Sequence, residues 1–282
     1  MTPRVSIVVP AYNNADFIGE TIESILAQTY RDFELVIADH ASTDATLDVV
    51  STFSDPRIRV EHTDAGGGAK RNWDRVSRLA TGDYLKLVCG DDLISPTLIE
   101  EQLAAFERHP SAVLVASQRA LVDAAGKTII GTRGLGTLSG LVAGRDAARA
   151  AVLAGSNIFG EPGCVLMRRD VLERIGWWDN DHPFLIDQAT FTEVALQGDV
   201  VALRKSLASF RVNAGQWSVR LAREQAAQAA GFHHKLRRDY PDLLSRNDVR
   251  IGNARALLTS FLRRAVYVLL RRRITHRPST QA

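Results

Sequence analysis

Two adjacent carboxylates, Asp91 and Asp92, have the types and spacing that most directly suggest chemistry in this sequence. Neighbouring carboxylates repel each other unless a cation or hydrogen bonds compensate. The pair follows an apolar run, and Mg²⁺ or Mn²⁺ takes oxygen ligands of this kind together with substrate phosphates. The pair therefore predicts a divalent-metal site, with a solvated turn before the next helix as the alternative.

Two cations follow a glycine run. Lys70 and Arg71 come directly after Gly66-Gly67-Gly68-Ala69, at the expected start of a helix. Guanidinium groups and helix N-termini both favour phosphate, so this segment is a candidate phosphate site; a linker with a solvated basic face is the alternative. The sequence has neither a Walker A loop nor a GxGxxG fingerprint, which weakens the case for a P-loop or NAD(P) protein.

Two further aspartates have ordinary structural alternatives. Asp39 follows an apolar run and could accept hydrogen bonds from a base or a ribose, although a turn residue at a strand end is the simpler interpretation. Asp187 begins an expected helix, where an aspartate most often serves as the N-cap.

These residues lie in the loops of a regular alternation of strands and helices. Five short apolar runs predict strands: 5–9, 33–38, 58–61, 84–88 and 112–116. A helix is expected after each of the first four, beginning near Asn14, Ser42 or Thr43, Ala69 and Ser95. This order indicates an α/β sheet with helices on both faces, where ligands bind beyond the carboxyl ends of the strands.

The second half of the chain is less regular. Residues 131–144 are rich in glycine and predict a mobile loop. The remaining expected elements are helices over 145–153, 187–196, 219–240 and 243–273 and two short strands over 200–203 and 207–211.

Length and composition argue against a disordered chain, a collagen, a small secreted scaffold and an integral membrane protein. The chain has 282 residues, of which 45% are apolar and 24% charged, as in a globular protein with a sizeable core. The two cysteines, Cys89 and Cys164, are too few for a disulfide framework and fit a reducing compartment. The first residues contain too short an apolar run for a signal peptide, and no stretch approaches the roughly 18 apolar residues of a membrane span. We expect a cytoplasmic protein.

The end of the chain is strongly basic. Residues 249–282 contain eight arginines and no acidic residue, whereas the whole chain carries only +3. Between Leu257 and Leu270, apolar residues recur at spacings of three and four with arginines around them, which predicts an amphipathic helix. Residues 255–273 are therefore a candidate surface for an anionic membrane at its inner face, and a helix packed on the domain or on a dimer partner is the alternative. Nucleic acid is not expected as a partner, since only Phe261 and Tyr267 lie among the arginines as stacking residues.

Five motifs in order carry a resemblance to a known family. They are VSIVVPAYN at 5–13, TIESILAQT at 21–29, FELVIADHASTD at 33–44, AKRN at 69–72 and GDYLKLVCGDD at 82–92. This pattern resembles the opening of the family 2 inverting glycosyltransferases over residues 4–110. It continues more loosely to about residue 213, through PGCVLMRR at 162–169 and GWWD at 176–179.

The resemblance implies a GT-A fold, which is a Rossmann-like mixed sheet flanked by helices, here with a C-terminal helical extension. It divides the chain into a nucleotide-sugar-binding half (1–115, the donor half), an acceptor-binding half of the same domain (116–215) and a basic helical extension (216–282). The implied donor is a nucleoside-diphosphate sugar, with UDP- or dTDP-sugars expected. The implied acceptor is a glycan or a lipid-linked sugar.

The same resemblance assigns roles to individual residues. Pro10, Ala11, Tyr12 and Asp39 line the nucleoside pocket, with Asp39 on the base. Lys70 and Arg71 lie near the base or the phosphates. Asp91 and Asp92 match the family's DxD-type motif, with Asp92 as the ligand of Mg²⁺ or Mn²⁺, and Asp187 matches the catalytic base.

These roles make chemical sense together. Negative charge builds on the departing diphosphate, which a cation stabilises, while a carboxylate takes the proton of the acceptor hydroxyl. One direct displacement inverts the anomeric centre. His40, Cys89 and Asn213 depart from the family pattern. Asn213 stands where the family often has a histidine, so a third metal ligand is not expected there. His40 and Cys89 leave a catalytically silent scaffold of the same fold at the membrane open as an alternative.

Overall fold

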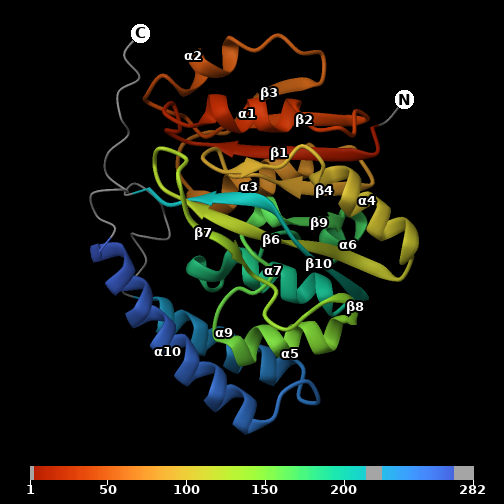
Figure 1. Ribbon diagram of the computed structural model, residues 1–282, viewed down its shortest axis with the longest axis vertical. Coiled ribbons are helices and arrows are strands. Elements are labelled where there is room, and N and C mark those ends of the chain that lie inside the picture. Colours follow the sequence, from red (N-terminus) through yellow and green to blue (C-terminus); the bar gives the residue numbers. More distant parts are fainter. Residues whose placement is uncertain (1–2, 214–223, 270–282) are drawn as a thin grey trace.

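The computed structural model describes residues 3–213 and 224–269. Within these residues the chain forms one large sheet with helices on both faces, and the strand order is β3-β2-β1-β4-β9-β6-β10-β5 (Figure 1). β7 pairs with β6, and β8 pairs with β10. The sheet is mixed, as expected: β1 to β4 run parallel, whereas β9 is antiparallel to both β4 and β6.

The strands are β1 Val5–Ala11, β2 Phe33–Asp39, β3 Ile58–His62, β4 Tyr84–Leu87, β5 Leu93–Ile94, β6 Ala112–Val122, β7 Thr128–Arg133, β8 Gly140–Ala143, β9 Val165–Arg168 and β10 Asp199–Arg211. The helices are α1 Ile18–Leu26, α2 Thr46–Ser51, α3 Gly68–Arg78, α4 Leu98–Arg108, α5 Gly144–Ala154, α6 Arg169–Arg174, α7 Ile186–Ala195, α9 Gln225–Asp239 and α10 Arg246–Leu269.

The donor half follows the expected pattern. β1, β2 and β4 are buried almost throughout, which explains why their sequences are continuous apolar runs instead of alternating patterns. Ala11 is paired with Asp39 at the ends of β1 and β2, so the loops that follow these strands meet at one edge of the sheet. The expected boundary at residue 115 lies inside β6, so the donor and acceptor halves share this strand.

Two expectations in the acceptor half are wrong. The glycine-rich segment 131–144 is not a loop throughout, because it contains the end of β7 and all of β8, which pairs with β10. The two short strands expected over 200–203 and 207–211 are one strand, β10, whose pairing with β6 shifts register between Leu203 and Ala208. Pairing with distant strands holds both segments extended despite their weak local patterns.

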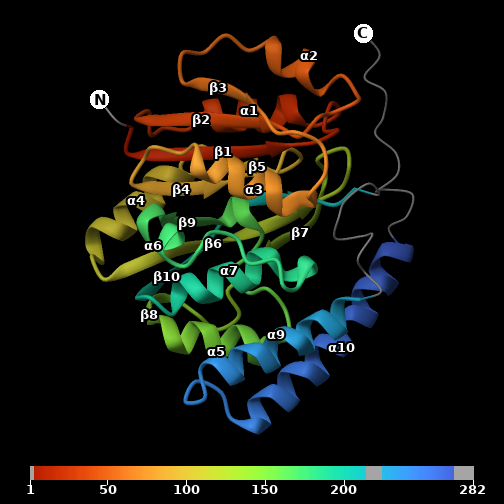
Figure 2. The same ribbon diagram turned by 180° about the vertical axis from the view of Figure 1, so that it is seen from behind.

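The C-terminal helices form a second, smaller core. α10 packs against both α9 and α5, at the end of the molecule opposite β1–β3 (Figures 1 and 2). Val152, Phe232, Leu236, Leu244 and Val249 are buried in this core. The expected helices are confirmed over 225–239 and 246–269, whereas their expected residues 219–223 and 270–273 lie outside the described residues. No helix in the described part of the chain is both long and apolar enough to span a bilayer.

Candidate active site

The strand ends that meet at the sheet edge are tied together by a buried amide. Asn72, on the first turns of α3, donates from Nδ2 to the carbonyl oxygens of Ala11 (3.3 Å) and Ala38 (2.8 Å). Its Oδ1 accepts from Thr63 Oγ1 at 2.7 Å. The amide therefore fixes the ends of β1 and β2 relative to α3.

Asp39 is only 2% exposed at this edge. Its Oδ2 accepts from the Ser42 backbone N–H at 3.1 Å, which is the turn role considered above. Its Oδ1 is buried without a hydrogen-bond partner. A buried carboxylate oxygen left unpaired is costly, and Asp39 Oδ1 keeps the capacity to accept one further hydrogen bond.

The neighbouring residues form one wall beside Asp39. Ala11 and the half-buried Pro10 pair with Asp39 and Ala38 across β1 and β2. Tyr12 is 56% exposed, and its ring centroid lies 6.0 Å from that of His40. The structure thus brings together the four residues expected for the nucleoside pocket.

The two cations of α3 diverge. Arg71 donates to the carbonyl oxygen of Ala65 at 3.0 Å and to Asp64 Oδ2 at 3.2 Å. It therefore lies along the loop 64–66, whose Gly66 carbonyl oxygen is 2.8 Å from His40 Nε2. Lys70 forms an ion pair with Asp74 and lines a cavity of about 360 Å³ together with residues 175–181. The structure therefore does not group Lys70 with the nucleoside residues, and its expected contact with the donor stays a prediction.

The carboxylate pair after β4 is buried: Asp91 is 8% and Asp92 is 2% exposed. A solvated turn is therefore excluded. Asp92 Oδ1 accepts from the Arg211 backbone N–H at 3.0 Å, and Asp91 Oδ2 accepts from Asn213 Nδ2 at 2.8 Å. Burial, and then the charge of Asp91, raises the pKa of Asp92 well above its usual range.

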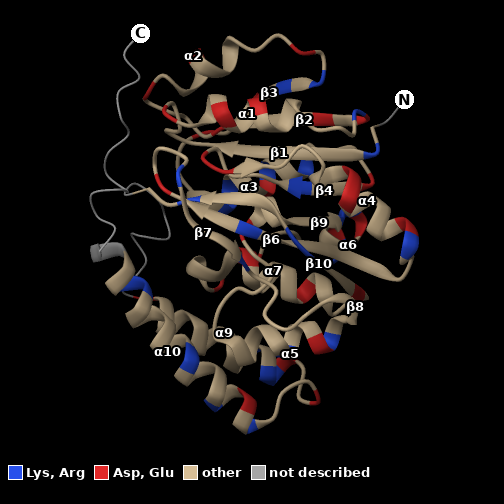
Figure 3. Cartoon of the chain, viewed as in Figure 1, with Lys and Arg blue, Asp and Glu red and all other residues tan. Residues whose placement is uncertain are grey.

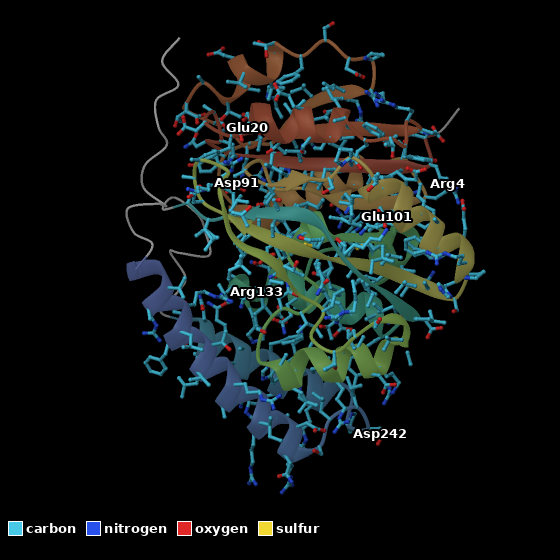
Figure 4. All side chains as sticks on the ribbon, in the orientation of Figure 1. Arg4, Glu20, Asp91, Glu101, Arg133 and Asp242 are labelled. Atoms are coloured by element: carbon cyan, nitrogen blue, oxygen red, sulfur yellow. The ribbon has the colours of Figure 1, made fainter. Side chains whose placement is uncertain are left out.

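Arg211 is a site residue that the sequence did not reveal. Its side chain is fully buried and donates to the Asp91 carbonyl (2.9 Å), the Ala124 carbonyl (3.0 Å) and Glu20 Oε2 (2.5 Å). Figure 4 shows Glu20 and Asp91 on the same side of the molecule. One guanidinium thus fixes the carboxylate loop against α1 and the β6–β7 turn.

The residues present fit a metal that is bound together with a phosphate ligand. Among the described residues, no hydrogen bond reaches Asp92 Oδ2, and no group of three or more His, Cys, Asp or Glu side chains is arranged to hold a metal by itself. Mg²⁺ typically binds to one or two protein carboxylates and completes its shell with water and substrate phosphates. Asp91 and Asp92 provide such a partial set.

Asp187 lies in the first turn of α7, but its carboxylate does not act as a conventional N-cap, since α7 has no side-chain cap hydrogen bond. Oδ1 accepts from the adjacent Gln188 N–H at 2.7 Å, and Oδ2 accepts from Asn157 Nδ2 at 2.9 Å. Burial, and then the charge of Glu161, raises the pKa of Asp187 to about 7. A carboxylate with such a pKa can take up a proton near neutral pH.

The amide of Asn157 is hydrogen-bonded through both its nitrogen and its oxygen. Its Nδ2 divides between Asp187 Oδ2 and the Gly160 carbonyl oxygen (2.7 Å), and its Oδ1 accepts from the Phe159 N–H at 3.1 Å. The amide can therefore hold Asp187 in one orientation only. No pattern in the sequence distinguished this residue.

Glu161 is close enough to Asp92 and to Asp187 to raise the pKa of both, and it is paired with the buried Arg119, whose Nη2 donates to Glu161 Oε1 at 3.0 Å. After burial itself, the charges of Asp92, Asp91, Asp187 and Glu161 raise the pKa of the Cys89 thiol. All four carboxylates therefore act on the same position, which indicates that Asp187 lies near the Asp91–Asp92 loop. Cys164 is buried in the hydrophobic core.

Comparison with known families gives one match that covers more than half of the chain. The family described as "Glycosyl transferase family 2" matches residues 6–176. A curated relative is the UDP-Glc:alpha-D-GlcNAc-diphosphoundecaprenol beta-1,3-glucosyltransferase WfaP of Escherichia coli, which is 36% identical over 103 residues, 36% of this chain and 41% of that protein. The first relatives matched are likewise covered over only about two fifths of their own length.

Solved structures resemble the fold over nearly the whole chain. TarS 1-349 of S. aureus in complex with UDP-GlcNAc has a TM-score of 0.70 at 18% identity, covering 95% of this chain and 76% of that one. The mannosyltransferase PcManGT from Pyrobaculum calidifontis, in complex with GDP-Man and Mn2+, has a TM-score of 0.65 at 22% identity, with the same coverage. The expected fold is confirmed.

Proposed function

The chain belongs to glycosyl transferase family 2, and from this premise we propose that it moves a sugar from a nucleoside-diphosphate sugar to a hydroxyl of a glycan or lipid-linked acceptor, with inversion. The observation that carries the proposal is the proximity of two different carboxylate sites. One is the buried Asp91–Asp92 pair, and the other is Asp187 with its pKa near 7.

The donor's base is assigned to the wall beside Asp39. Uracil and thymine both present an N–H that the unpaired Asp39 Oδ1 can accept, and Tyr12 offers an exposed ring for contact with the nucleoside. We therefore expect UDP- or dTDP-sugars. The similar proteins named above carry UDP-GlcNAc and GDP-Man, which supports a nucleotide-sugar donor of some kind.

The diphosphate is assigned to the carboxylate loop. Mg²⁺ or Mn²⁺, held by Asp92 with Asp91 beside it, would supply positive charge for the departing diphosphate. Arg211 and Asn213 hold the loop in position from the protein side.

Asp187 is assigned the role of general base. The acceptor oxygen attacks the anomeric carbon while its proton passes to the Asp187 carboxylate, and the bond from that carbon to the diphosphate oxygen breaks. The new bond forms on the face opposite the one that breaks, so the configuration inverts in a single step.

The first experiment measures donor binding and turnover. UDP-Glc, UDP-GlcNAc, a dTDP-sugar and GDP-Man are each tested with and without Mn²⁺, by thermal denaturation and by release of nucleoside diphosphate. We expect at least one donor to raise the unfolding temperature in a metal-dependent way and to be turned over. Binding without turnover, even with acceptor-rich membrane extracts, would favour the silent scaffold instead, and an absence of binding would contradict the proposal.

We also propose peripheral attachment to the inner face of an anionic membrane through α10. Val249, Gly252, Ala256 and Ser260 form its buried face. The large apolar side chains exposed along it are Ile251, Leu257, Leu258, Phe261, Leu262 and Val266. Arginines are spaced along the same helix (Figure 3). A helix that is apolar on both sides, with arginines between them, suits the boundary between headgroups and acyl chains. The diphosphoundecaprenol in the name of WfaP supports a lipid-linked acceptor.

Flotation with vesicles tests this attachment. Leu258→Glu with Phe261→Glu should abolish binding to vesicles containing phosphatidylglycerol. Val60→Glu with Ile130→Glu introduces the same charge at exposed apolar positions on β3 and β7 and should leave binding unchanged. Equal flotation of both double variants would remove α10 from the functional account.

A further inference from the structure

A cavity of about 270 Å³ lies between α9 and α10, away from the active site; we call it the cation cavity. Its lining residues are His234, Arg237, Arg246, Val249, Arg250 and Asn253. No carboxylate is among these lining residues.

The three arginines of the cation cavity take part in no ion pair with the described residues, unlike the cations around them. On the same two helices and on α5, Arg238 pairs with Asp239 at 3.0 Å and Arg149 pairs with Asp248 at 2.8 Å. Asp248 is also on α10, but it is paired with Arg149 and does not line the cation cavity. Arg237 Nε is buried without a hydrogen-bond partner.

The amide that lines the cation cavity is oriented as a donor. His233, fully buried, has Nδ1 at 2.8 Å from Asn253 Oδ1, so the ring donates an N–H to that oxygen. Burial lowers the pKa of His233, which keeps the ring neutral. With Oδ1 engaged, the N–H groups of the Asn253 amide remain to face the cavity.

We propose that the cation cavity binds a phosphate-bearing anion. Three guanidinium groups and an amide present donors to one space, and guanidinium groups match the oxygens of phosphate with paired hydrogen bonds. Arg246 and Arg250 stand one turn apart on the helix that carries the exposed apolar face. The headgroup of an anionic phospholipid is therefore one source of this phosphate, and a free phosphate compound is the other. The site does not depend on the proposed sugar transfer.

The experiment compares two double variants that remove the same charge. Arg237→Gln with Arg250→Gln removes two donors from the cation cavity. Arg238→Gln with Arg174→Gln is the control, since Arg238 is paired with Asp239 at 3.0 Å and Arg174, on α6, is paired with Asp170 at 2.9 Å.

Two probes separate the sources of phosphate. Inorganic phosphate and glycerol 1-phosphate are titrated in thermal denaturation against chloride of equal ionic strength. Vesicles with phosphatidylglycerol are compared with vesicles of phosphatidylcholine alone in sedimentation. We expect the cavity variant to lose at least about tenfold in affinity for the effective probe, and the control to lose less than about twofold.

Each outcome decides the proposal. Protection by the soluble phosphates that only the cavity variant loses supports a site for free phosphate. Vesicle binding that the cavity variant loses selectively supports a site for a lipid headgroup. If the two double variants behave alike with both probes, the proposal is wrong. A folding defect is recognised from the unfolding temperature in chloride. Removing two unpaired cations should not lower this temperature, so a lower value in the cavity variant indicates a defect in folding.

Discussion

The two carboxylate sites of this protein are buried alike but are built for different tasks. In each, burial raises the pKa of an aspartate, and a neighbouring carboxylate raises it further: Asp91 acts on Asp92, and Glu161 acts on Asp187. At the metal loop the two charges are adjacent in sequence and need a cation to coexist. At Asp187 the second charge belongs to a different loop and is partly neutralised by Arg119. Under the proposed function, the first site holds negative charge for a metal ion, whereas the second gains and loses one proton.

The largest effect is expected at the base. Asp187→Asn keeps the shape of the side chain and removes its basicity, which typically costs about a hundred- to ten-thousand-fold in rate. The affinity for the nucleotide sugar should change little. Steady-state kinetics with the best donor, together with a direct binding measurement, checks both statements; an unchanged rate would return Asp187 to a purely structural role.

A slightly smaller loss is expected at the metal loop. Asp92→Asn removes a charged oxygen and should lower the rate by about a hundred- to a thousand-fold, the range seen when one stabilising group of a charged transition state is lost. Unlike the change at Asp187, it should also raise the metal concentration required. Asp91→Asn is expected to be milder. Titration of Mn²⁺ after chelation of resident metal measures this, and insensitivity of the native protein to EDTA would contradict the metal assignment.

Asn157→Ala should alter the base without touching the metal loop. Loss of a donor to the ionised carboxylate raises the pKa of Asp187, by about one unit for a charged hydrogen bond. The acid limb of the kcat/KM profile should move to higher pH, with a loss of about fivefold at pH 7 that recovers above about pH 9.

A control variant distinguishes the effect of Asn157 on Asp187 from a general effect on the stability of the protein. Gln28 is a buried amide that ties α1 to the Ser95 carbonyl oxygen at 2.8 Å, with no contact to either carboxylate site. Gln28→Ala should lower the unfolding temperature and leave the pH profile unchanged. If Asn157→Ala behaves in the same way, Asn157 does not position the base.

Glu161→Gln should act in the opposite direction on the same profile. Removal of this charge, which also leaves Arg119 unopposed, lowers the pKa of Asp187, so the acid limb should move to lower pH. The gain at pH 7 is at most about twofold, because a base with a pKa near 7 is already half ionised there. Of the charged groups that act on the pKa of Asp187, Glu161 raises it and Arg119 lowers it, so only removal of Glu161 should move the limb in this direction. A limb that stays in place would show that Glu161 does not act on Asp187.

The smallest effect concerns stability. A carboxylate whose pKa is higher in the folded state binds its proton more tightly there, so its contribution to stability is greatest at low pH. For Asp187 that contribution should be lost progressively from about pH 4 to about pH 7 and stay constant above. The unfolding free energy of the native protein should therefore fall relative to that of Asp187→Asn across this window, as measured by denaturant titration at several pH values. A constant difference would contradict the raised pKa.

The position of the Asp91–Asp92 loop was predictable from the sequence, whereas much of the surroundings of Asp187 was not. Asp39 is the last residue of one buried parallel strand, and Asp91 and Asp92 follow another. The apolar runs of both strands are readable in the sequence, and the carboxyl ends of such strands meet at the edge where ligands bind. The motif did not indicate that Asp39 keeps one oxygen unpaired or that Asp92 is buried, since both depend on groups far away in the chain.

In the acceptor half, contacts between distant segments determine the structure more than the local sequence pattern does. Asn157 and Glu161 belong to an irregular segment with no periodicity, and their roles appear only when α7 and β6 are placed beside it. The same is true of residues 131–144, where glycines suggested a loop but β10 supplies a partner strand. Secondary-structure propensity depends on residues close in the sequence, so it does not predict pairing with a strand from a distant part of the chain.

Arg211 has a consequence for how the protein is made. Its contacts with Asp91 and Asp92 span 120 and 119 positions of the chain, so the metal loop leaves the ribosome well before the strand that fixes it. Until β10 inserts between β6 and β5, the growing chain contains Asp91 and Asp92, which are buried in the folded protein, but not yet the guanidinium group of Arg211 that holds their loop. A fragment that stops before β10 should therefore carry every donor motif and still be unable to assemble the loop, so the N-terminal segment cannot serve as a portable nucleotide-sugar module.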